Sequence, residues 1–326
     1  MDFDRLATRV LEGYRIERDE GLAILESKDT ELSALLEATS RLRESAHGRD
    51  VTLHVLQNAK SGSCPEDCSF CSQSTHFDTD VDRYRIQTVD ELIAGAQQAH
   101  SMGATRYCMV TSTRAPSGRE LEVVCEATRR IKAEYPLEIC ASLGFLNANS
   151  ATQLAEAGVD RFNHNIETSE RHFGNVVTTH SWKDRVETVM TAKAAGMETC
   201  CGGIIGMGET IDDRLDFALS LRDMEVDSIP VNFLDPRGGT PLGDQTRLTP
   251  EDCLRMLALV RFANPKRDIR VAGGREKALG DKQMLSLKAA NSLFTEGYLT
   301  TGGQGYLQDV DLIEGAGYRI ALVMPA

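Results

Sequence analysis

Residues 88–110 read TVDELIAGAQQAHSMGATRYCMV, and this stretch predicts the architecture of the chain. Thr88 and Glu91 form a capping box, in which two side chains close the first helical turn, and apolar residues follow at helical spacing. Gly103 then ends the helix, and residues 106–110 are typical of a strand. The stretch therefore predicts a helix that leads directly into a strand.

The same order of helix, glycine and strand recurs along the chain. A helix around Leu154, for example, ends at Gly158 before a strand over 161–166. Successive units of this kind build a parallel sheet. The other elements predicted in this way are helices over 181–195, over 210–222 and from residue 249, and strands at 51–56, 137–143, 198–201, 228–234 and 269–272.

The number of successive units favours a closed (β/α)8 TIM-type barrel of the α/β class, with extra helices at the N-terminus. An open doubly wound sheet remains the alternative, because periodicity cannot show whether a sheet closes. No linker or low-complexity segment interrupts the pattern. We therefore predict one domain over residues 1–326, composed of a helical extension at 1–50, the barrel at 51–310 and a C-terminal tail at 311–326.

The composition excludes several classes of partner. With 36 Lys and Arg against 49 Asp and Glu among 326 residues, the formal net charge is −13, so the chain offers no basic footprint for nucleic acid. No run approaches the roughly 18 continuous apolar residues of a membrane span. The start of the chain shows no cationic flank followed by an apolar run. We predict a cytoplasmic protein whose partners include neither nucleic acid nor a membrane.

Three of the nine cysteines lie close together, in the motif Cys64-Pro-Glu-Asp-Cys68-Ser-Phe-Cys71. A reducing compartment favours metal ligands, catalytic thiols or buried apolar thiols over disulfides. An iron–sulfur cluster held by three cysteines leaves one iron for a non-protein ligand, whereas the alternative is a structural zinc loop with a distant fourth ligand. We favour the cluster, because the spacing is asymmetric and the loop follows a strand, where the chemistry of barrels occurs.

The cysteine motif, with Phe70 before its last cysteine, resembles the radical S-adenosylmethionine (SAM) superfamily. Within that superfamily, further motifs resemble the biotin synthase family. These motifs are Asn58-Ala-Lys-Ser-Gly-Ser-Cys-Pro-Glu-Asp-Cys68, Tyr107-Cys-Met109, Phe162-Asn-His-Asn-Ile-Glu-Thr-Ser169, Gly202-Gly-Ile-Ile-Gly-Met-Gly-Glu-Thr210 and Ala272-Gly-Gly-Arg-Glu276. The resemblance runs from the first helices nearly to the C-terminus.

The resemblance implies a sulfurtransferase that inserts sulfur into dethiobiotin to form biotin, the last step of biotin biosynthesis. A [4Fe-4S] cluster on Cys64, Cys68 and Cys71 would cleave SAM to methionine and a 5′-deoxyadenosyl radical, which abstracts hydrogen from the substrate. A bridging sulfide of a [2Fe-2S] cluster would trap the carbon radical. The resemblance also implies a flavodoxin- or ferredoxin-type electron donor, a homodimer, and no catalytic residue beyond the cofactor ligands.

Cysteines also lie on three predicted strands, at Cys108, at Cys140 and at the adjacent pair Cys200 and Cys201. Each alone is typical of a buried apolar residue, but three thiols together can meet inside a barrel. Neighbouring residues of a strand face opposite sides, so alternation lets either Cys200 or Cys201 point inward, but not both. The resemblance selects Cys200, and Cys201 would then pack against the outer helices. The [2Fe-2S] ligands that it implies are Cys108, Cys140, Cys200 and Arg270.

Three polar residues, Asn163, Asn165 and Glu167, share one face of a strand, whereas His164 and Ile166 take the other face. Hydrogen-bonding groups on an inward face are costly unless a polar ligand satisfies them. By resemblance, Asn165 and Glu167 hold the ribose hydroxyls of SAM, although the family often has Asp or Asn where this chain has Glu167.

The resemblance implies further contacts on later strands. Asn163, together with Asn232, would meet the ureido ring of the substrate. The stretch from Gly203 to Glu209 resembles the strand of the superfamily whose backbone groups contact the adenine. The SAM contacts implied in this stretch are Gly203, Ile205 and Glu209.

Several other residues receive weaker predictions. Arg106 lies two positions before Cys108 on the same predicted strand, so the two side chains face the same side. We therefore expect Arg106 to support the second cluster electrostatically. Ser228 and Ser292 are weaker candidates for residues that surround the cofactor ligands. Cys125 and Cys253 fall on apolar helix faces, so we expect both to be core residues. The histidines to which we assign no role are His54, His76, His172 and His180.

Two alternative functions remain open. One is another radical SAM enzyme, such as a hydrogenase maturase or a sulfur-inserting enzyme that acts on RNA, the latter disfavoured by the net charge of −13. The other is a non-catalytic zinc-binding protein, which would not need polar residues that converge inside a barrel.

Overall fold

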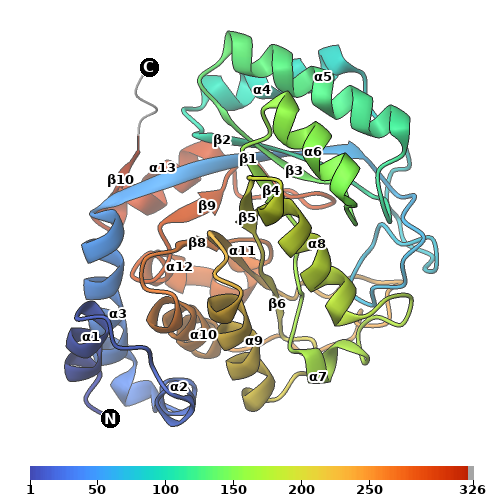
Figure 1. Ribbon diagram of the computed structural model, residues 1–326. Coiled ribbons are helices and arrows are strands. Elements are labelled where there is room, and N and C mark those ends of the chain that lie inside the picture. Colours follow the sequence, from blue (N-terminus) through green and yellow to red (C-terminus); the bar gives the residue numbers. More distant parts are fainter. Residues whose placement is uncertain (322–326) are drawn as a thin grey trace.

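The computed structural model describes residues 1–321 and shows a barrel of parallel strands surrounded by helices (Figure 1). Hydrogen bonds join the barrel strands in the order β1, β2, β3, β4, β5, β7, β8, β9, and β6 pairs with β7. The strands are β1 (Asp50–Lys60), β2 (Arg106–Thr111), β3 (Glu138–Ser142), β4 (Arg161–Asn163), β5 (Glu198–Cys200), β6 (Gly203–Ile205), β7 (Ser228–Phe233), β8 (Asp268–Val271), β9 (Ser292–Phe294) and β10 (Arg319–Ile320).

The barrel closes because β1 pairs with β2 on one side and with β9 on the other. In the closing pair, Thr52 lies opposite Ser292 and Leu53 lies opposite Leu293. The predicted (β/α)8 barrel is therefore confirmed, and the open doubly wound alternative is wrong. No sequence pattern predicts β9, because this strand has only 3 residues and follows a helix of only 4 residues.

β5 and β6 together occupy one position in the barrel. Both pair with β7, β5 through Cys200 and β6 through Gly203. The break between them lies at Cys201 and Gly202, where a Cβ atom on Gly202 would stand 1.9 Å from the carbonyl oxygen of Pro230. Two backbones approach closely at this point, so only glycine fits.

The helices cover the outside of the barrel, and side-chain caps set where they begin. Thr88 Oγ1 accepts a hydrogen bond from the Glu91 amide at 3.3 Å, and the Glu91 carboxylate accepts one from the Thr88 amide at 2.7 Å, which confirms the predicted capping box. The helices are α1 (Phe3–Leu11), α2 (Arg18–Leu25), α3 (Leu32–His47), α4 (Val89–Ser101), α5 (Gly118–Glu134), α6 (Ala148–Ala157), α7 (Glu170–Phe173), α8 (Trp182–Ala194), α9 (Ile211–Asp223), α10 (Pro250–Ala263), α11 (Arg275–Leu279), α12 (Gln283–Ser286) and α13 (Tyr306–Gly315), with 3-10 turns η1 (Asp29–Glu31) and η2 (Gly280–Lys282).

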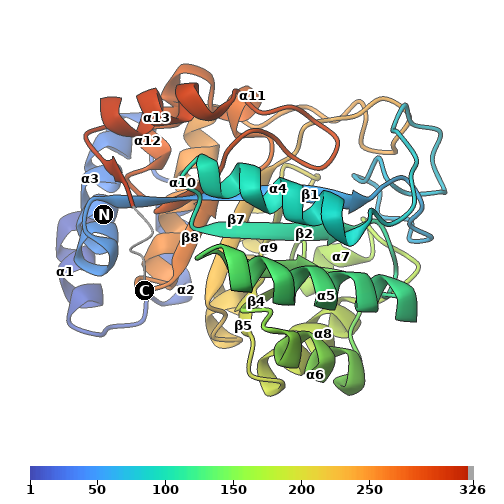
Figure 2. The same ribbon diagram turned by 90° about the horizontal axis from the view of Figure 1, so that it is seen from above.

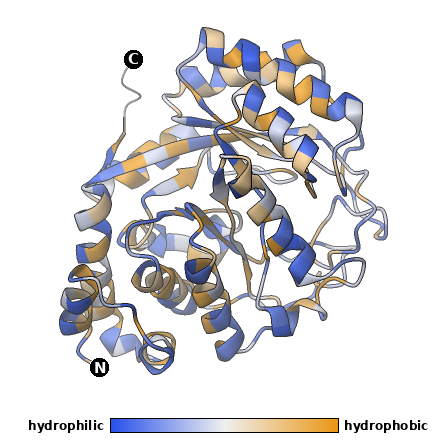
Figure 3. Ribbon diagram, viewed as in Figure 1, coloured by the Kyte–Doolittle hydropathy of each residue, from blue (hydrophilic) through white to orange (hydrophobic). Residues whose placement is uncertain are grey.

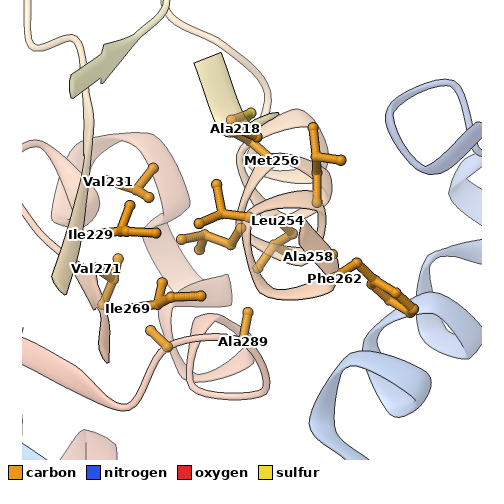
Figure 4. Close-up of a cluster of buried hydrophobic side chains, with 14 of the residues drawn as sticks. Ala218, Ile229, Val231, Leu254, Met256, Ala258, Phe262, Ile269, Val271 and Ala289 are labelled. Atoms are coloured by element: carbon orange, nitrogen blue, oxygen red, sulfur yellow. The ribbon is translucent and has the colours of Figure 1, made fainter. Parts of the chain in front are cut away.

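The helices carry hydrophilic residues on their outer faces and hydrophobic residues toward the barrel (Figure 3). The core around α10 joins the barrel to the N-terminal helices. Ile229 of β7 and Ile269 of β8 lie beside α10, and Phe262 projects from the other side of α10 toward the N-terminal helices (Figure 4). Burial of each such side chain contributes about 1.5–3 kcal/mol. The helices before residue 50 therefore share one hydrophobic core with the barrel.

The long loops that follow β1 and β7 project from one end of the barrel, opposite the end where α1 lies (Figure 2). The segment predicted as a C-terminal tail, 311–326, includes the end of α13 and β10, in which Arg319 pairs with Asp50 of β1. Residues 322–326 of that segment lie outside the described residues. None of the helices within residues 1–321 is long and apolar enough to cross a membrane.

Candidate active site

A cavity of about 400 Å³ opens at the end of the barrel from which the long loops project. Its wall consists mainly of the C-terminal ends of the barrel strands and of the loops that follow β1, β2, β3, β4, β7 and β9. This end of a TIM-type barrel is where active sites form, because the loops after the strands converge there. The six thiols singled out from the sequence all line this cavity: Cys64, Cys68, Cys71, Cys108, Cys140 and Cys200.

The loop after β1 brings Cys64, Cys68 and Cys71 to one side of the cavity. Backbone hydrogen bonds shape the loop, from the Cys71 amide to the Cys68 carbonyl at 2.9 Å and from the Thr75 amide to the Cys64 carbonyl at 2.8 Å. Burial raises the pKa of all three thiols, that of Cys71 to about 11, whereas the nearby Arg185 guanidinium acts in the opposite direction. The thiolates therefore need a cation to stabilise them, and the iron of a cluster supplies that charge.

The spacing of the three thiols differs from that of a single-ion site. Among residues 1–321, no three His, Cys, Asp or Glu side chains lie together in a group that could hold one metal ion. Cysteines that bind an iron–sulfur cluster each take a different iron and so stand further apart than the ligands of one ion. The loop thus presents three cysteines to one cavity, which is the number of protein ligands that leaves one iron of a cluster free.

A second set of thiols lies on the strands. Cys108 of β2 pairs with Cys140 of β3 in the parallel register, and Cys200 of β5 pairs with Asn163 of β4. The interaction between the Cys108 and Cys140 thiols lowers the pKa of Cys108 and raises that of Cys140. Cys200 lines the cavity, whereas Cys201 is fully buried in the hydrophobic core, as strand alternation allows.

Arg270 of β8 faces the same interior as the strand thiols. Its Nη1 lies 3.7 Å from Cys200 Sγ, and its Nη2 donates to Ser228 Oγ at 3.0 Å and to Asp268 Oδ2 at 3.3 Å. Arg270 Nε is buried and has no hydrogen-bond partner within residues 1–321. A buried donor of this kind is costly when it is unsatisfied, so the site fits a further group beside Arg270.

The residues near Arg270 connect through Asp268. Ser228 Oγ donates to Asp268 Oδ2 at 2.7 Å and Ser292 Oγ donates to Asp268 Oδ1 at 2.6 Å, so both serines contact this carboxylate, and Ser228 Oγ also accepts from Arg270. Arg106 forms an ion pair with Glu138. Arg106 also helps to lower the pKa of Cys108, after the larger effects of Cys140 and of Arg270.

The polar residues predicted to bind ligands also line the cavity. Asn163 Nδ2 donates to Asn165 Oδ1 at 3.2 Å and lies 3.3 Å from Cys200 Sγ, while Asn165 Nδ2 donates to Glu167 Oε2 at 3.4 Å. On β7, Asn232 donates from Nδ2 to the Gly203 carbonyl at 3.0 Å. The amides thus form a continuous polar wall beside the second set of thiols.

Glu167 occupies an unusual backbone conformation, with φ at 65°. A non-glycine residue in this left-handed region costs about 1–3 kcal/mol, and such residues cluster at functional sites. The carbonyl of Glu167 approaches β6 so closely that a Cβ atom on Gly203 would lie 2.2 Å from it. Burial raises the pKa of Glu167, and Arg185 opposes this effect.

The stretch from Gly203 to Glu209 contains three predicted SAM contacts, but a different residue of this stretch lines the cavity. Ile204 lines the cavity, whereas Ile205 is only 1% exposed and packs in the hydrophobic core. The Glu209 carboxylate accepts hydrogen bonds from the Gly206 amide at 2.8 Å and the Met207 amide at 2.6 Å. Gly203, Ile205 and Glu209 can therefore contribute backbone groups or loop shape, but none of the three lines the cavity.

Two histidines, His164 and His180, line the cavity, although neither was predicted from the sequence to do so. His164 does so because β4 ends at Asn163, and alternation no longer holds beyond a strand end. His180 contacts Glu66 and Arg185, both of which also line the cavity. The cluster of His180, Glu66 and Arg185 could have been suspected from the sequence through Arg185, because it is a charged residue on the buried face of α8.

The geometry agrees with comparisons to known proteins. Residues 59–221 match the model of the Radical SAM superfamily, and residues 230–319 match that of the Biotin and Thiamin Synthesis associated domain. The biotin synthase of Salinibacter ruber is 57% identical over 98% of this chain and 89% of its own length. The chain belongs to the biotin synthase family. Another member, from Geobacillus thermodenitrificans, is 47% identical over 97% of this chain and 95% of its own length.

Solved structures support the fold. Methylornithine synthase is similar over 98% of both chains, with a TM-score of 0.86 and 21% sequence identity. The FeFe-hydrogenase maturase of Carboxydothermus hydrogenoformans covers 98% of this chain and 79% of its own, with a TM-score of 0.82 and 16% identity. At these identities the likeness concerns the barrel alone.

Membership of the biotin synthase family makes the chain a radical SAM enzyme. The family implies three cofactors, which are SAM, a [4Fe-4S] cluster and a [2Fe-2S] cluster. The alternatives of a non-catalytic zinc-binding protein and of a hydrogenase maturase are therefore wrong, because the family match covers nearly the whole chain.

Proposed function

We propose that this enzyme carries out the last step of biotin biosynthesis, the insertion of sulfur into dethiobiotin, as a sulfurtransferase. The observation that carries the proposal is that two separate sets of three thiols face one cavity. One set comes from the loop after β1, and the other comes from β2, β3 and β5. A reaction that both generates a radical and delivers sulfur needs two metal centres that one substrate can reach.

We assign Cys64, Cys68 and Cys71 to the [4Fe-4S] cluster, and Cys108, Cys140, Cys200 and Arg270 to the [2Fe-2S] cluster. When bound, the first cluster supplies the electron that cleaves SAM, and the second supplies sulfur. The proximity of Arg270 to Cys200 supports the second assignment, because a guanidinium beside a thiol stabilises the thiolate, and thiolates rather than thiols bind iron. The register of adjacent strands supports it as well.

The ligands would lie along the polar wall of the cavity. Asn165 and Glu167 would hold the ribose hydroxyls of SAM, and what supports this is that both line the cavity and that Glu167 pairs with Gly203 of β6. Asn163 and Asn232 would orient the ureido ring of the substrate, since amide groups complement both its N–H and its C=O groups. Fixed orientation at short distance is the main contribution that such residues make to a radical transfer.

The aromatic residues of the wall would exclude water from the reaction. Phe70, Phe145 and Phe294 line the cavity together with Leu234. An apolar lining with few polar groups is typical of small-molecule sites. Exclusion of water protects a reactive carbon radical from side reactions.

The remaining parts of the proposal concern partners. We propose a flavodoxin- or ferredoxin-type electron donor, a homodimer and a cytoplasmic location, with residues 1–326 acting as one domain. A reducing location is supported by nine cysteines that form no disulfide within residues 1–321.

The proposal is tested by an anaerobic assay. The protein is loaded with iron and isotopically labelled sulfide, then incubated with SAM, dethiobiotin and a chemical reductant. We expect labelled biotin and 5′-deoxyadenosine by mass spectrometry. A matched Cys125→Ala control should keep both products, because Cys125 lies in the core under α5. Formation of 5′-deoxyadenosine without biotin would show that the substrate is a different molecule.

A further inference from the structure

Arg185 of α8 connects two parts of the site. Its Nη2 donates to Cys68 Sγ at 3.5 Å, and its Nη1 donates to Glu167 Oε1 at 3.2 Å and to the Asn165 carbonyl at 2.9 Å. The Arg185 side chain is only 8% exposed. One guanidinium therefore contacts a thiol assigned to the first cluster and both residues assigned to the ribose of SAM.

His180 contacts the remaining edge of this guanidinium. Arg185 Nε donates to His180 Nε2 at 2.9 Å. The His180 ring is itself enclosed, since Phe145 lies 5.0 Å and Phe173 lies 5.6 Å from it between ring centroids. Its side chain is 1% exposed, so the packing leaves the imidazole little freedom to turn.

The other ring nitrogen of His180 contacts Glu66, a residue of the cysteine loop. The second carboxylate oxygen of Glu66 accepts a hydrogen bond from Arg114, and Thr179 Oγ1 donates to the same oxygen as His180. Arg114, Thr179 and His180 each present a donor to Glu66, and the two oxygens of its side chain accept from all three. Glu66 is therefore a carboxylate that accepts every one of these hydrogen bonds.

These contacts allow only one form of His180. Nδ1 faces a carboxylate and must donate, whereas Nε2 faces the N–H of Arg185 and must accept. The neutral ring with its proton on Nδ1 satisfies both requirements. Burial and the charge of Arg185 lower the pKa of His180, in agreement with a neutral ring.

We propose that His180 is a positioning residue: held by Glu66, it accepts the Nε proton of Arg185 and so fixes this guanidinium against Cys68 and Glu167. The inference rests on the proposed function, because it takes Cys68 as a cluster ligand and Glu167 as a SAM contact. Glu66 belongs to the loop that carries the cysteines, so the same network ties the loop to α8.

The network predicts two measurable effects. A hydrogen bond to a cluster sulfur stabilises the reduced, more negative state and so raises the reduction potential. A fixed Glu167 carboxylate binds a ribose without first losing side-chain freedom, which strengthens binding. Loss of His180 as acceptor should therefore lower the reduction potential of the first cluster and weaken SAM binding together.

A pair of substitutions separates the two hydrogen bonds of His180. In His180→Gln the amide oxygen reaches the position of Nε2 and can still accept from Arg185. In His180→Asn the shorter amide reaches only the position of Nδ1 and contacts Glu66 alone. The measurements are the SAM dissociation constant by equilibrium dialysis and the potential of the first cluster by a redox titration followed by electron paramagnetic resonance, both on the iron-loaded enzyme.

We expect His180→Asn to raise the SAM dissociation constant about tenfold and to shift the cluster to a more negative potential, with iron content unchanged. His180→Gln should stay within about twofold of the wild type, since it keeps the acceptor. Equal losses in the two variants, or no loss in His180→Asn, would overturn the inference.

A third variant decides the case in which His180→Asn fails to fold or to bind iron. Arg114→Gln removes a contact to Glu66 from a side chain that is 51% exposed, so the fold should tolerate it. We expect a smaller change in both measurements and in the same direction, and wild-type values would refute the network. A wild-type protein without a [4Fe-4S] cluster or SAM binding would instead refute the proposed function, whereas wild-type binding with unaffected variants would refute this inference alone.

Discussion

Cys108 and Cys140 lie directly opposite each other on neighbouring parallel strands, and the interaction between their thiols lowers the pKa of Cys108. Adjacent strands are about 4.8 Å apart, so the register brings the two sulfurs to the same depth of the barrel. Cys200 joins them from β5, where it pairs with Asn163. The second set of thiols is therefore a product of strand register, whereas the first set is a product of one short loop.

The loop thiols provide the first prediction. Cys68→Ala should abolish reductive cleavage of SAM, because a cluster that loses one of three protein ligands is not held in place. Cys253→Ala is the matched control, since Cys253 is fully buried among apolar residues of α10 and does not line the cavity. The measurements are iron content and 5′-deoxyadenosine by chromatography. Formation of 5′-deoxyadenosine by the Cys68→Ala protein would contradict the assignment.

The second prediction concerns the neighbours Cys200 and Cys201. Cys200→Ala should remove the second cluster, because Cys200 lines the cavity beside Arg270. Cys201→Ala should keep that cluster and lower the free energy of unfolding by about 1 kcal/mol, as expected for a small loss of core packing. Mössbauer spectra of the two iron-loaded variants check both outcomes. Loss of the second cluster in Cys201→Ala alone would reverse the assignment.

The third prediction concerns Arg270, an unusual residue in a set of metal ligands because its guanidinium is nearly always protonated. We expect Arg270→Ala to assemble the second cluster on three cysteines, with an altered absorption spectrum and some remaining sulfur insertion. The fold should survive, since Asp268 keeps its contacts with Arg161, Ser228 and Ser292. An unchanged spectrum would show that Arg270 is not a ligand, and a folded protein without the cluster would show that it is an essential one.

The fourth prediction separates Ile204 from Ile205. Ile205→Ala should lower the free energy of unfolding by about 2–5 kcal/mol, because it empties a fully packed core position. Ile204→Ala should cost less stability but weaken SAM binding, since Ile204 lines the cavity. Urea unfolding and equilibrium dialysis on both variants provide the check. A larger stability loss in Ile204→Ala would mean that β6 faces the other way.

The fifth prediction is a pH dependence at Asp213, which joins the starts of α7 and α9. Burial acts to raise its pKa, but hydrogen bonds from Ser169 Oγ at 2.6 Å and from Thr210 Oγ1 at 2.6 Å, with Arg171 nearby, hold the pKa well below its usual range. A carboxylate with a lowered pKa stabilises the folded state above its unfolded pKa of about 4, and this stabilisation is lost as the pH falls toward the folded value.

We therefore expect Asp213→Asn to lose about 2 kcal/mol of unfolding free energy at neutral pH, with the difference from wild type shrinking below about pH 4. Circular dichroism during urea unfolding of the cluster-free chain measures this difference without interference from acid loss of iron. Asp311→Asn, on the exposed surface of α13, should match the wild type at every pH. A difference that stays constant down to acidic pH would contradict the role of the charge.

The local elements could be predicted from the sequence because local interactions determine them. The capping box at Thr88, the glycine stop at Gly158 and the proline at Pro250 each act within one helical turn, and the structure places helix boundaries at these residues. The loop motif of Cys64, Cys68 and Cys71 is of the same kind, since three ligands within one short segment need no distant partner.

Other features required the tertiary structure. Strand alternation left Cys200 and Cys201 equivalent, and only packing of the barrel against its helices buries one and opens the other to the cavity. The inward position of His164 follows from the end of β4, which depends on pairing with neighbouring strands. Contacts such as Arg185 with Cys68 join residues 117 positions apart.

The sequence by itself therefore determined the family, the order of the helices and strands that form the repeating units, and the chemistry of the cysteines, because composition, spacing and short-range caps carry that information. Only the tertiary structure decided that the barrel closes through β1 and β9 and that His180, Arg185 and Glu66 meet beside the first set of thiols. The physical reason is that closure and buried polar networks depend on contacts between distant segments, which no local pattern encodes.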